Sequence, residues 1–169
     1  MIEARTLTYP TARVYTIRPA DYEDIYKMLA LFEEEVRAGR MLPRTYGETR
    51  ANIDNWLVAE QDGELVGCVS LVYFDESLCE VRSLAVAPHY RGNGLGRALV
   101  SAALDLADER GVTRVLTLTR SVKLFENLGF YPGLVSNFPE KVWRDCRPCP
   151  FRHRCDEVAL LYDFEDVEE

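Results

Sequence analysis

Residues 80–97 read E-V-R-S-L-A-V-A-P-H-Y-R-G-N-G-L-G-R, and the rest of the chain is best interpreted from this stretch. Its first half, residues 80–87, alternates and is rich in Val, Leu and Ala, which is typical of a strand. Pro88 ends that strand, because proline lacks a backbone N–H and disfavours helical geometry in the residue before it. A loop with three glycines follows, and residues 98–110 predict a helix. The order of strand, glycine loop and helix start is typical of an anion site.

The glycine loop offers an anion both backbone donors and formal charge. The first amide N–H groups of a helix have no intrahelical partner, and the helix dipole adds partial positive charge there. Gly92, Gly94 and Gly96 leave the backbone open to a phosphate, because glycine has no Cβ. Arg91 and Arg97 supply charge on either side. The loop therefore predicts a phosphate or diphosphate site.

Two familiar phosphate loops do not fit this sequence. The Walker pattern ends in Gly-Lys-Ser/Thr, whereas Gly96 is followed by Arg97 and Ala98. The dinucleotide fingerprint belongs to the first strand of a chain, whereas these glycines lie in mid-chain with a different spacing. The stretch instead resembles the R-x-x-G-x-G/A loop of the GNAT acyltransferase superfamily, which binds the pyrophosphate of acetyl-CoA. The alternative interpretation is a helix N-terminus that contains glycines without binding a ligand.

The GNAT resemblance implies that acetyl-CoA is the cosubstrate of this chain. It also implies that the pantetheine arm pairs, like an extra strand, with the backbone just before the glycine loop. The residues expected on this basis to contact acetyl-CoA are Leu84, Ala85, Val86, Arg91, Gly92, Asn93, Gly94, Leu95, Gly96 and Arg97.

The remaining pattern of the chain predicts an α+β fold. Asp21 precedes an apolar stripe at helical spacing that Gly39 ends, and Thr45 is placed to cap a second helix. Asp62 and Gly63 between two apolar runs predict a hairpin with a type I′ turn. Strands are expected in residues 14–17, 56–60, 65–72, 78–87, 115–118 and 158–162. The expected GNAT fold has a mixed central sheet of about six to seven strands, flanked by helices. It combines an antiparallel meander with a parallel pair that the CoA splays.

Length and composition are those of one globular domain. The chain has 169 residues and a net charge of −8, which argues against nucleic acid as a partner. No apolar run suits a membrane span or a signal peptide, and an odd number of cysteines indicates reduced thiols and a cytoplasmic location. We divide the chain into a flexible N-terminal arm, residues 1–13, and a single GNAT domain, residues 14–169. The C-terminal segment 141–157 of that domain contains cysteines.

Glu80 is the candidate general base. Acetyl transfer from a thioester to an amine requires the amine to lose a proton. The strand E-V-R-S-L-A-V resembles the one that carries a basic glutamate in many GNAT members. An ordinary carboxylate is a weak base for an ammonium, so either burial makes it more basic or a water relays the proton. The alternative is a surface carboxylate that pairs with Arg82 on the same face of the strand.

The general acid departs from the family pattern. Many relatives place a tyrosine at the second aromatic of an F-Y-x-x-x-G-F segment, whereas Phe125 has no proton to give. Thr119 and Ser121, at the end of a predicted strand, are the nearest hydroxyls in the sequence, and Tyr131 is a further option. A CoA thiol can also leave as a thiolate without an acid.

Several further segments carry a closer resemblance. They are M-L-P-R (41–44), E-L-V-G-C (64–68), L-T-L-T-R-S (116–121), F-E-N-L-G-F (125–130) and a tail K-V-W-R-D-C-R-P-C-P…C-D-E-V-A (141–159). With the Glu80 strand they resemble the acetyltransferase domain of N-acetylglutamate synthases, above all the short stand-alone bacterial form. This resemblance implies transfer of the acetyl group to the α-amino group of L-glutamate, by direct attack in a ternary complex. The alternatives are another small amine, a protein N-terminus, or a catalytically silent CoA-binding module.

The acceptor site is expected to use arginines, because a dicarboxylate needs cations and the arginine fork suits carboxylates. The resemblance implies that Arg44 grips the acceptor and that the backbones of Ser83 and Leu118 contact it. Arg154 is a less close match to a C-terminal substrate arginine, and Arg120 is a further candidate. The alternative for each arginine is solvated surface.

Three cysteines near the C-terminus, Cys146, Cys149 and Cys155, form the pattern C-x-x-C-x-x-x-x-x-C. A zinc site with one more ligand is one interpretation, but no second C-x-x-C or H-x-x-x-H completes it. We therefore expect no metal, and packed or paired thiols instead. The partners expected are a small amine or amino acid and, as an open option, a second copy of the chain in a homodimer. Neither nucleic acid nor a membrane is expected.

Overall fold

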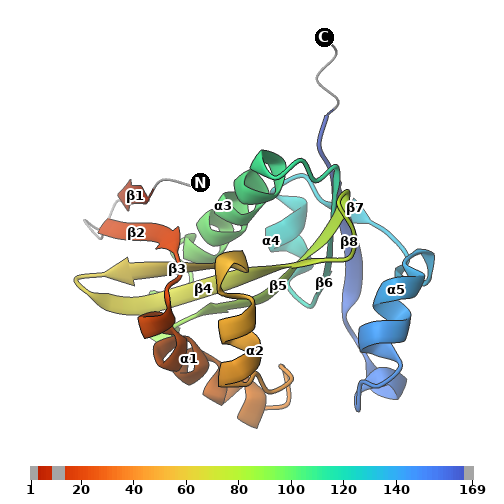
Figure 1. Cartoon of the computed structure of the whole chain (residues 1–169), viewed down its shortest axis with the longest axis horizontal. Coiled ribbons are helices and arrows are strands. Elements are labelled where there is room, and N and C mark those ends of the chain that lie inside the picture. The colour runs from red at the N-terminus through yellow and green to blue at the C-terminus, as the bar shows by residue number, and fades with distance from the viewer. Residues whose placement is uncertain (1–3, 9–13, 166–169) are drawn as a thin grey trace.

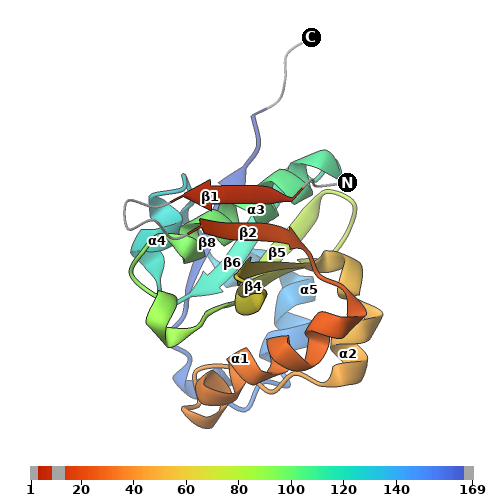
Figure 2. The same ribbon diagram turned by 90° about the vertical axis from the view of Figure 1, so that its left-hand side faces the viewer.

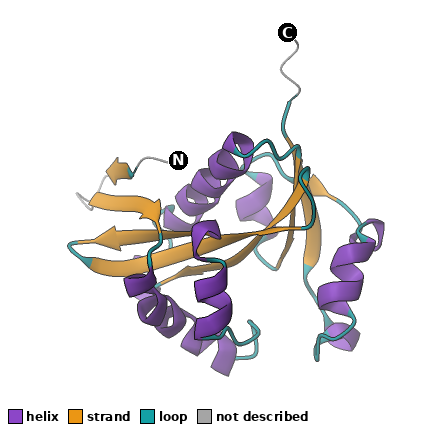
Figure 3. Cartoon of the chain, in the orientation of Figure 1, coloured by secondary structure: helices purple, strands orange, loops and turns teal. Residues whose placement is uncertain are grey.

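The computed structural model describes residues 4–8 and 14–165, and in this part an eight-stranded sheet carries helices on both faces (Figures 1 and 3). The strands are β1 Arg5–Thr8, β2 Val14–Pro19, β3 Trp56–Gln61, β4 Glu64–Tyr73, β5 Leu78–Val86, β6 Arg114–Thr119, β7 Tyr131–Pro132 and β8 Val158–Asp163, in the sheet order β1-β2-β3-β4-β5-β6-β8-β7. The α-helices are α1 Ile25–Arg37, α2 Tyr46–Ala51, α3 Leu95–Glu109, α4 Val122–Glu126 and α5 Pro139–Lys141. The predicted α+β fold with a mixed sheet is confirmed. Two short edge strands, β1 and β7, bring the count to eight.

The predicted loose arm, residues 1–13, is corrected over part of its length. Strand β1 pairs antiparallel with β2, with Arg5 opposite Ile17 and Thr8 opposite Val14. Arg5 also forms an ion pair with Asp105 of α3. A strand at the edge of a sheet offers unpaired N–H and C=O groups, and β1 satisfies those of β2. The rest of that arm, residues 1–3 and 9–13, lies outside the described residues.

Apolar residues on both faces of the central strands pack against helices, with one layer of helices on each face. Leu57 of β3 packs in the cluster that contains Leu99 of α3, whereas its neighbour Val58 packs with Met28 and Phe32 of α1. This split follows from the strand geometry, because successive side chains point to opposite faces. Figure 2 shows α3 on one side of the sheet and α1 and α2 on the other. Within the described residues, no helix is both long and apolar enough to cross a membrane.

The capping and turn signals of the sequence act as predicted. The Asp21 side chain accepts the N–H of Glu23 at 2.9 Å and so caps the 3₁₀ turn Tyr22–Asp24, which continues into α1. Thr45 caps α2 with its side chain and forms a reciprocal capping box. Asp62 and Gly63 have φ of +51° and +77°, the positive values that a type I′ hairpin turn requires. The loop before α2 and the β3–β4 hairpin are therefore fixed by local chemistry.

The parallel strands β5 and β6 stay together over a short stretch and then diverge. Their pairs run from Leu78 opposite Arg114 to Glu80 opposite Leu116, and no further pair joins them among the described residues. Strand β6 continues instead along β8. Strand β5 bends away near Ser83, whose φ of +59° accompanies a register shift against β4. The sheet is thus forked, and Glu80 stands at the base of the fork.

Candidate active site

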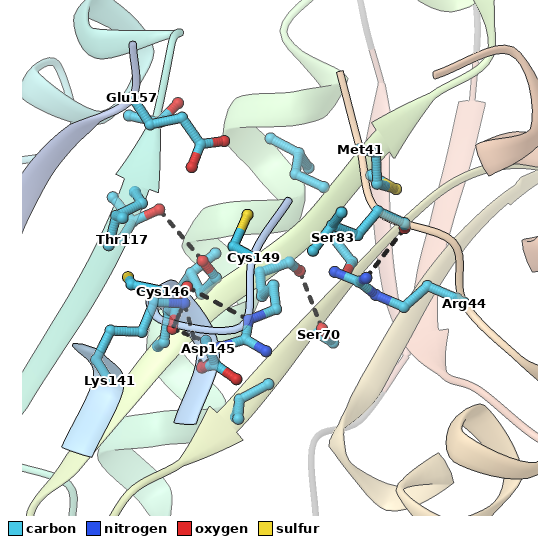
Figure 4. A pocket seen from close by; sticks show the side chains of 18 of the residues that line it. Met41, Arg44, Ser70, Ser83, Thr117, Lys141, Asp145, Cys146, Cys149 and Glu157 are labelled. Carbon is cyan, nitrogen blue, oxygen red and sulfur yellow. Dashed lines mark hydrogen bonds and ion pairs between the residues drawn. The ribbon is translucent and has the colours of Figure 1, made fainter. Parts of the chain in front are cut away.

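A cavity of about 1210 Å³ opens at the fork (Figure 4). Its walls come from the loop before α2, from β4 and β5, from the end of β6, and from residues 135–157. The sequence-predicted residues that line it are Arg44, Glu80, Ser83, Leu84, Leu118, Thr119, Arg120 and Ser121. The fold therefore brings together most of the side chains that the sequence singled out for chemistry and for acceptor binding.

Glu80 lies inside this cavity within a group of four charged side chains, and it is only 3% exposed. Arg82 Nη2 donates to Glu80 Oε2 at 2.8 Å, and Lys141 Nζ donates to Glu80 Oε2 at 2.9 Å and to Oε1 at 3.0 Å. Asp145 Oδ2 accepts from Arg82 Nη2 at 2.6 Å and from Lys141 Nζ at 3.3 Å. We call Glu80, Arg82, Lys141 and Asp145 the buried ion cluster. Its two carboxylates and two cations balance in charge.

Sequence reasoning identifies only half of this cluster. Glu80 and Arg82 are two residues apart on one strand and so share a face, and their pairing was the alternative considered for Glu80. That pairing exists, but inside the cavity rather than at the surface. The pattern does not indicate Lys141 and Asp145, because their i, i+4 spacing does not say which strand they reach. Burial opposes ionisation of Asp145, but Arg82 and Lys141 outweigh it and hold its pKa below the ordinary value.

Arg44 and Ser83 lie together at one side of the cavity (Figure 4). Arg44 Nε donates to Ser83 Oγ at 3.2 Å, and its Nη1 donates to the carbonyl of Leu42 at 3.0 Å. Burial, together with repulsion from Arg82, lowers the pKa of Arg44 below its ordinary value. No carboxylate among the described residues forms an ion pair with it. A half-buried guanidinium of this kind suits an incoming carboxylate.

Arg120 also lines the cavity, but its guanidinium already has partners. Its Nε donates to Asp156 Oδ1 at 2.7 Å, and its Nη1 donates to Glu157 Oε1 at 3.3 Å. Burial raises the pKa of Glu157, and Arg120 opposes that shift. An acceptor carboxylate would have to displace these two side chains, so Arg120 is a weaker candidate than Arg44.

The structure does not place the predicted C-terminal arginine in the cavity. Arg154 is exposed, its guanidinium lies 5.4 Å from the centre of the Phe151 ring, and the described cavity walls do not include it. Arg152, two residues earlier, lines the cavity instead, and no described carboxylate pairs with it. The cause is the 3₁₀ turn Arg152–Arg154, because residues two apart in such a turn point in different directions.

Two of the three hydroxyls considered as acids are in the cavity. Thr119, the last residue of β6, and Ser121, just beyond it, line the cavity, and Thr119 Oγ1 accepts the N–H of Ser121 at 2.8 Å. A hydroxyl can donate while it accepts, so Thr119 remains a candidate donor. Tyr131, the third option, lies on the edge strand β7, where its hydroxyl bonds to Asp163. Within the described residues it forms no part of the cavity wall.

The glycine loop has the geometry of an anion site. Gly92 and Gly94 have φ of +79° and +83°, in the left-handed region that glycine favours. Gly94 is the N-cap of α3, and Ala98 N donates to its carbonyl at 3.0 Å. The three N–H groups between them therefore precede the first helical hydrogen bond. A Cβ on Gly96 would come within 3.4 Å of Leu124 Cδ1, so glycine keeps this approach clear. The loop fits a diphosphate.

Both loop arginines hold weak surface contacts that a ligand could replace. Arg91 Nε donates to the carbonyl of Val86 at 2.9 Å, and its Nη2 lies 3.3 Å from Glu35 Oε1. Arg97 Nη2 lies 3.4 Å from the carbonyl of Asn127. These contacts are exposed, and exposed pairs contribute little to stability. Either guanidinium can therefore turn toward a bound phosphate.

The backbone just before the loop has one open edge. Ala85 pairs with Cys68 and Val86 with Gly67 of β4. On the other side of β5, no described strand pairs beyond Glu80, because β6 has diverged. A ligand arm could lie along this edge as an extra strand, which is the arrangement that the resemblance implies for residues 84–86.

The cysteines of the described residues are all free thiols, so of the two arrangements expected for the C-terminal thiols, packed or paired, the paired one is not seen. Cys146, Cys149 and Cys155 line the cavity, and burial raises the pKa of Cys146. No group of three or more His, Cys, Asp or Glu side chains in the described residues is arranged to hold a metal ion.

A forked sheet whose glycine loop begins the helix after the fork defines a class of CoA-dependent acyltransferases. Residues 14–130 match the model of the acetyltransferase (GNAT) family. The chain belongs to this family, and it is an acetyl-CoA-dependent N-acetyltransferase.

Two relatives show where in the family the chain lies. It is 34% identical over 145 residues to an uncharacterised N-acetyltransferase of Chlorobaculum tepidum, which covers 86% of this chain and 94% of that protein. It is 32% identical over 124 residues to the amino-acid acetyltransferase of Aeromonas salmonicida, which covers 72% of this chain. The chain spans only 28% of the length of the Aeromonas enzyme.

Solved structures show the same fold. N-acetylglutamate synthase of Neisseria gonorrhoeae, solved with coenzyme A and N-acetyl-glutamate, superposes with a TM-score of 0.80 at 26% identity, over 90% of this chain and 35% of the synthase. The protein Rv2747 of Mycobacterium tuberculosis, also solved with coenzyme A, gives a TM-score of 0.74 at 23% identity, over 88% of this chain and 99% of that one. At this identity the second likeness shows the fold alone.

Proposed function

We propose that this chain transfers the acetyl group of acetyl-CoA to the α-amino group of an amino acid, with L-glutamate as the acceptor, in a ternary complex. The observation that carries the proposal is a pair of cavity arginines, Arg44 and Arg152, without a carboxylate partner among the described residues. Every other cation that lines the cavity has one. The Aeromonas amino-acid acetyltransferase and the Neisseria synthase solved with N-acetyl-glutamate support this acceptor class.

These two arginines donate hydrogen bonds to Ser83, to His153 and to backbone carbonyls, but to no described carboxylate, and they match the two carboxylates of glutamate. Arg44 touches Ser83 of β5, three residues past Glu80, so it lies beside the fork where the reaction is expected. We therefore assign the α-carboxylate of the acceptor to Arg44. Arg152 lies on the C-terminal wall of the cavity and is assigned to the side-chain carboxylate. Charge-assisted hydrogen bonds to arginine are among the strongest that a carboxylate can form.

The chemistry is a direct attack of the acceptor nitrogen on the thioester carbonyl. A C–N bond forms while the C–S bond breaks, and the ammonium proton must leave for the attack to occur. We assign that proton to Glu80. Its oxygens already accept from Arg82 and Lys141, so a water molecule relays the proton. Thr119 and Ser121 are the cavity hydroxyls that we assign to the leaving sulfur.

Gly94→Ala is expected to weaken CoA binding by about tenfold. A side chain at a φ of +83° costs roughly 1–2 kcal/mol, and relief of that strain moves the N–H groups that face the diphosphate. Calorimetric titration with CoA measures the change. Gly47→Ala is the matched control, because no described atom beyond its own helix and chain neighbours lies within 4 Å of the added Cβ. Equal CoA affinity of both variants would contradict the assignment of the loop.

Arg152→Ala is expected to raise the KM for glutamate by about tenfold. The loss of one charge-assisted contact, worth about 1.5 kcal/mol for an exposed guanidinium, gives that factor. The kcat/KM for alanine, which lacks the second carboxylate, should stay unchanged. Arg154→Ala is the control from the same turn. An equal loss of kcat/KM for glutamate and for alanine would show that Arg152 does not bind the side-chain carboxylate of the acceptor.

The acceptor itself is tested by following thiol release from acetyl-CoA with a panel of amines. We expect glutamate to give the highest kcat/KM among glutamate, glutamine, alanine, lysine, a polyamine and a peptide with a free N-terminus. A preference for the polyamine or the peptide would replace the proposal with the corresponding alternative. A preference for alanine over glutamate would support an amino acid as the acceptor but contradict the role of Arg152 in binding a second carboxylate.

A further inference from the structure

The buried ion cluster holds the proposed base with two side chains from the far end of the chain. Glu80 and Arg82 belong to β5, whereas Lys141 ends α5 and Asp145 lies in the π-helical turn Val142–Cys146. The side chains of Glu80 and Lys141 are 4% and 8% exposed. Charges that are buried to this degree persist only when they are paired, so each charge in the cluster depends on the others.

We propose that Lys141 is a positioning residue for acetyl transfer, which holds Glu80 ionised and oriented so that it can receive the proton of the acceptor. The C-terminal segment 139–146 is then part of the active site rather than a cover for it. This inference deepens the proposed function and rests on it for the role of Glu80 as proton acceptor.

The local geometry places Lys141 against Glu80, and Asp145 against Arg82 and Lys141. In the π-helical turn Arg147 N donates to the carbonyl of Val142 at 2.8 Å, which widens the turn. Lys141 and Asp145, four residues apart, both point to the cavity, as Figure 4 shows. Trp143, between them, is 67% exposed. Lys141 and Asp145 therefore face β5, whereas Trp143 faces outward.

The charge balance gives Lys141 its effect. At rest the cluster holds two carboxylates and two cations, and the uptake of one proton by Glu80 leaves it with a net positive charge. That change occurs while negative charge develops on the thioester oxygen and sulfur, so the two changes favour each other. Without Lys141 the cluster carries a net negative charge at rest. Glu80 would then keep a proton and lose its function as a base.

The proton taken up by a cluster without Lys141 should settle on Glu80 rather than on Asp145. The Glu80 side chain is 4% exposed and the Asp145 side chain 24%, and burial disfavours the charged form. The other charged or titratable groups that face this pair come from four parts of the chain. They are Arg44 before α2, Cys79 on β5, Arg144 and Cys146 in the C-terminal segment, and Glu157 before β8.

The test compares Lys141→Met, Asp145→Asn and the double variant with the wild type over pH. The acid limb of kcat/KM and the NMR titration of the Glu80 carboxyl carbon are both measured. In Lys141→Met both midpoints should move to higher pH by roughly one to three units, the shift that loss of an adjacent opposite charge produces. In Asp145→Asn they should move to lower pH. In the double variant, where the cluster is again neutral, they should return toward the wild type.

These outcomes separate an electrostatic role from a structural one. If Lys141 only held the fold, the double variant would be worse than either single variant and no midpoint would move, which would overturn the inference. Lys27→Met, an exposed lysine of α1, is the matched control for loss of a positive charge. The NMR titration needs no substrate. A wild type that acetylates no amino acid would therefore remove the proposed function, while the titration still decides whether Lys141 governs the ionisation of Glu80.

Discussion

Glu80→Gln is expected to lower kcat by about 10²–10⁴-fold, the range that a general base contributes. Glutamine keeps the shape and a hydrogen-bond acceptor, but it cannot receive the acceptor proton. CoA affinity should stay close to that of the wild type, because the glycine loop of α3 lies beyond the other end of β5. Initial rates at saturating glutamate and acetyl-CoA give kcat, and calorimetry gives the CoA affinity.

The control for this variant is Asp145→Asn, which removes the same charge from the same cluster. Its kcat should stay within about tenfold of the wild type, because Asp145 holds the cluster together but takes no proton from the acceptor. Breaking a buried ion pair costs roughly 3–5 kcal/mol, so urea unfolding of both variants must accompany the kinetics. A folded Glu80→Gln variant with the kcat of the wild type would show that Glu80 is not the base.

Arg44→Ala is expected to raise the KM for glutamate by about 10- to 100-fold, with a much smaller change in kcat. A hydrogen bond to a charged group contributes about 1.5–3 kcal/mol, and each 1.4 kcal/mol is a factor of ten. The guanidinium is half-buried and has no carboxylate partner among the described residues. Water therefore competes little with a carboxylate that binds there. Steady-state kinetics at saturating acetyl-CoA measure the effect.

Arg40→Ala is the matched control for Arg44, because Arg40 lines the same cavity from the same loop but pairs with Glu35 at 2.8 Å. Its removal should leave the KM for glutamate within about twofold. Arg44→Lys should fall between the wild type and Arg44→Ala, because lysine keeps the charge but loses the bidentate geometry. If Arg40→Ala raised the KM as much as Arg44→Ala, the effect would belong to the loop rather than to the contact.

Local sequence signals predict the fold where a short stretch carries its own physics. Asp21, Thr45 and the Asp62–Gly63 turn act through hydrogen bonds and dihedral angles within a few residues, and each appears as predicted. The two short edge strands were not predicted. The residues of β1 were assigned to a loose arm, because a four-residue edge strand is held by its neighbour rather than by its own pattern.

The candidate site was predictable to the extent that family motifs mark it. Arg44 and Glu80 were found from segments that resemble known enzymes, and the structure brings both to one cavity. Lys141 lies 61 residues from Glu80 along the chain, and no periodicity connects the two. The sequence pattern favours Arg154 over Arg152, because a repeat of similar residues in a turn does not reveal which one points inward.

The amino-acid sequence by itself determined the glycine loop, the strand that precedes it and the family of this chain, because adjacent residues supply the donors, the clearance and the charge. Only the tertiary structure decided which charges are neutralised. A carboxylate two residues from an arginine can lie in solvent or in a closed cluster, and the difference depends on a segment that folds back from the far end of the chain. That segment brings Asp145 to Arg82 and Lys141 to Glu80. Of the half-buried arginines that line the described cavity, Arg44 alone has no carboxylate partner.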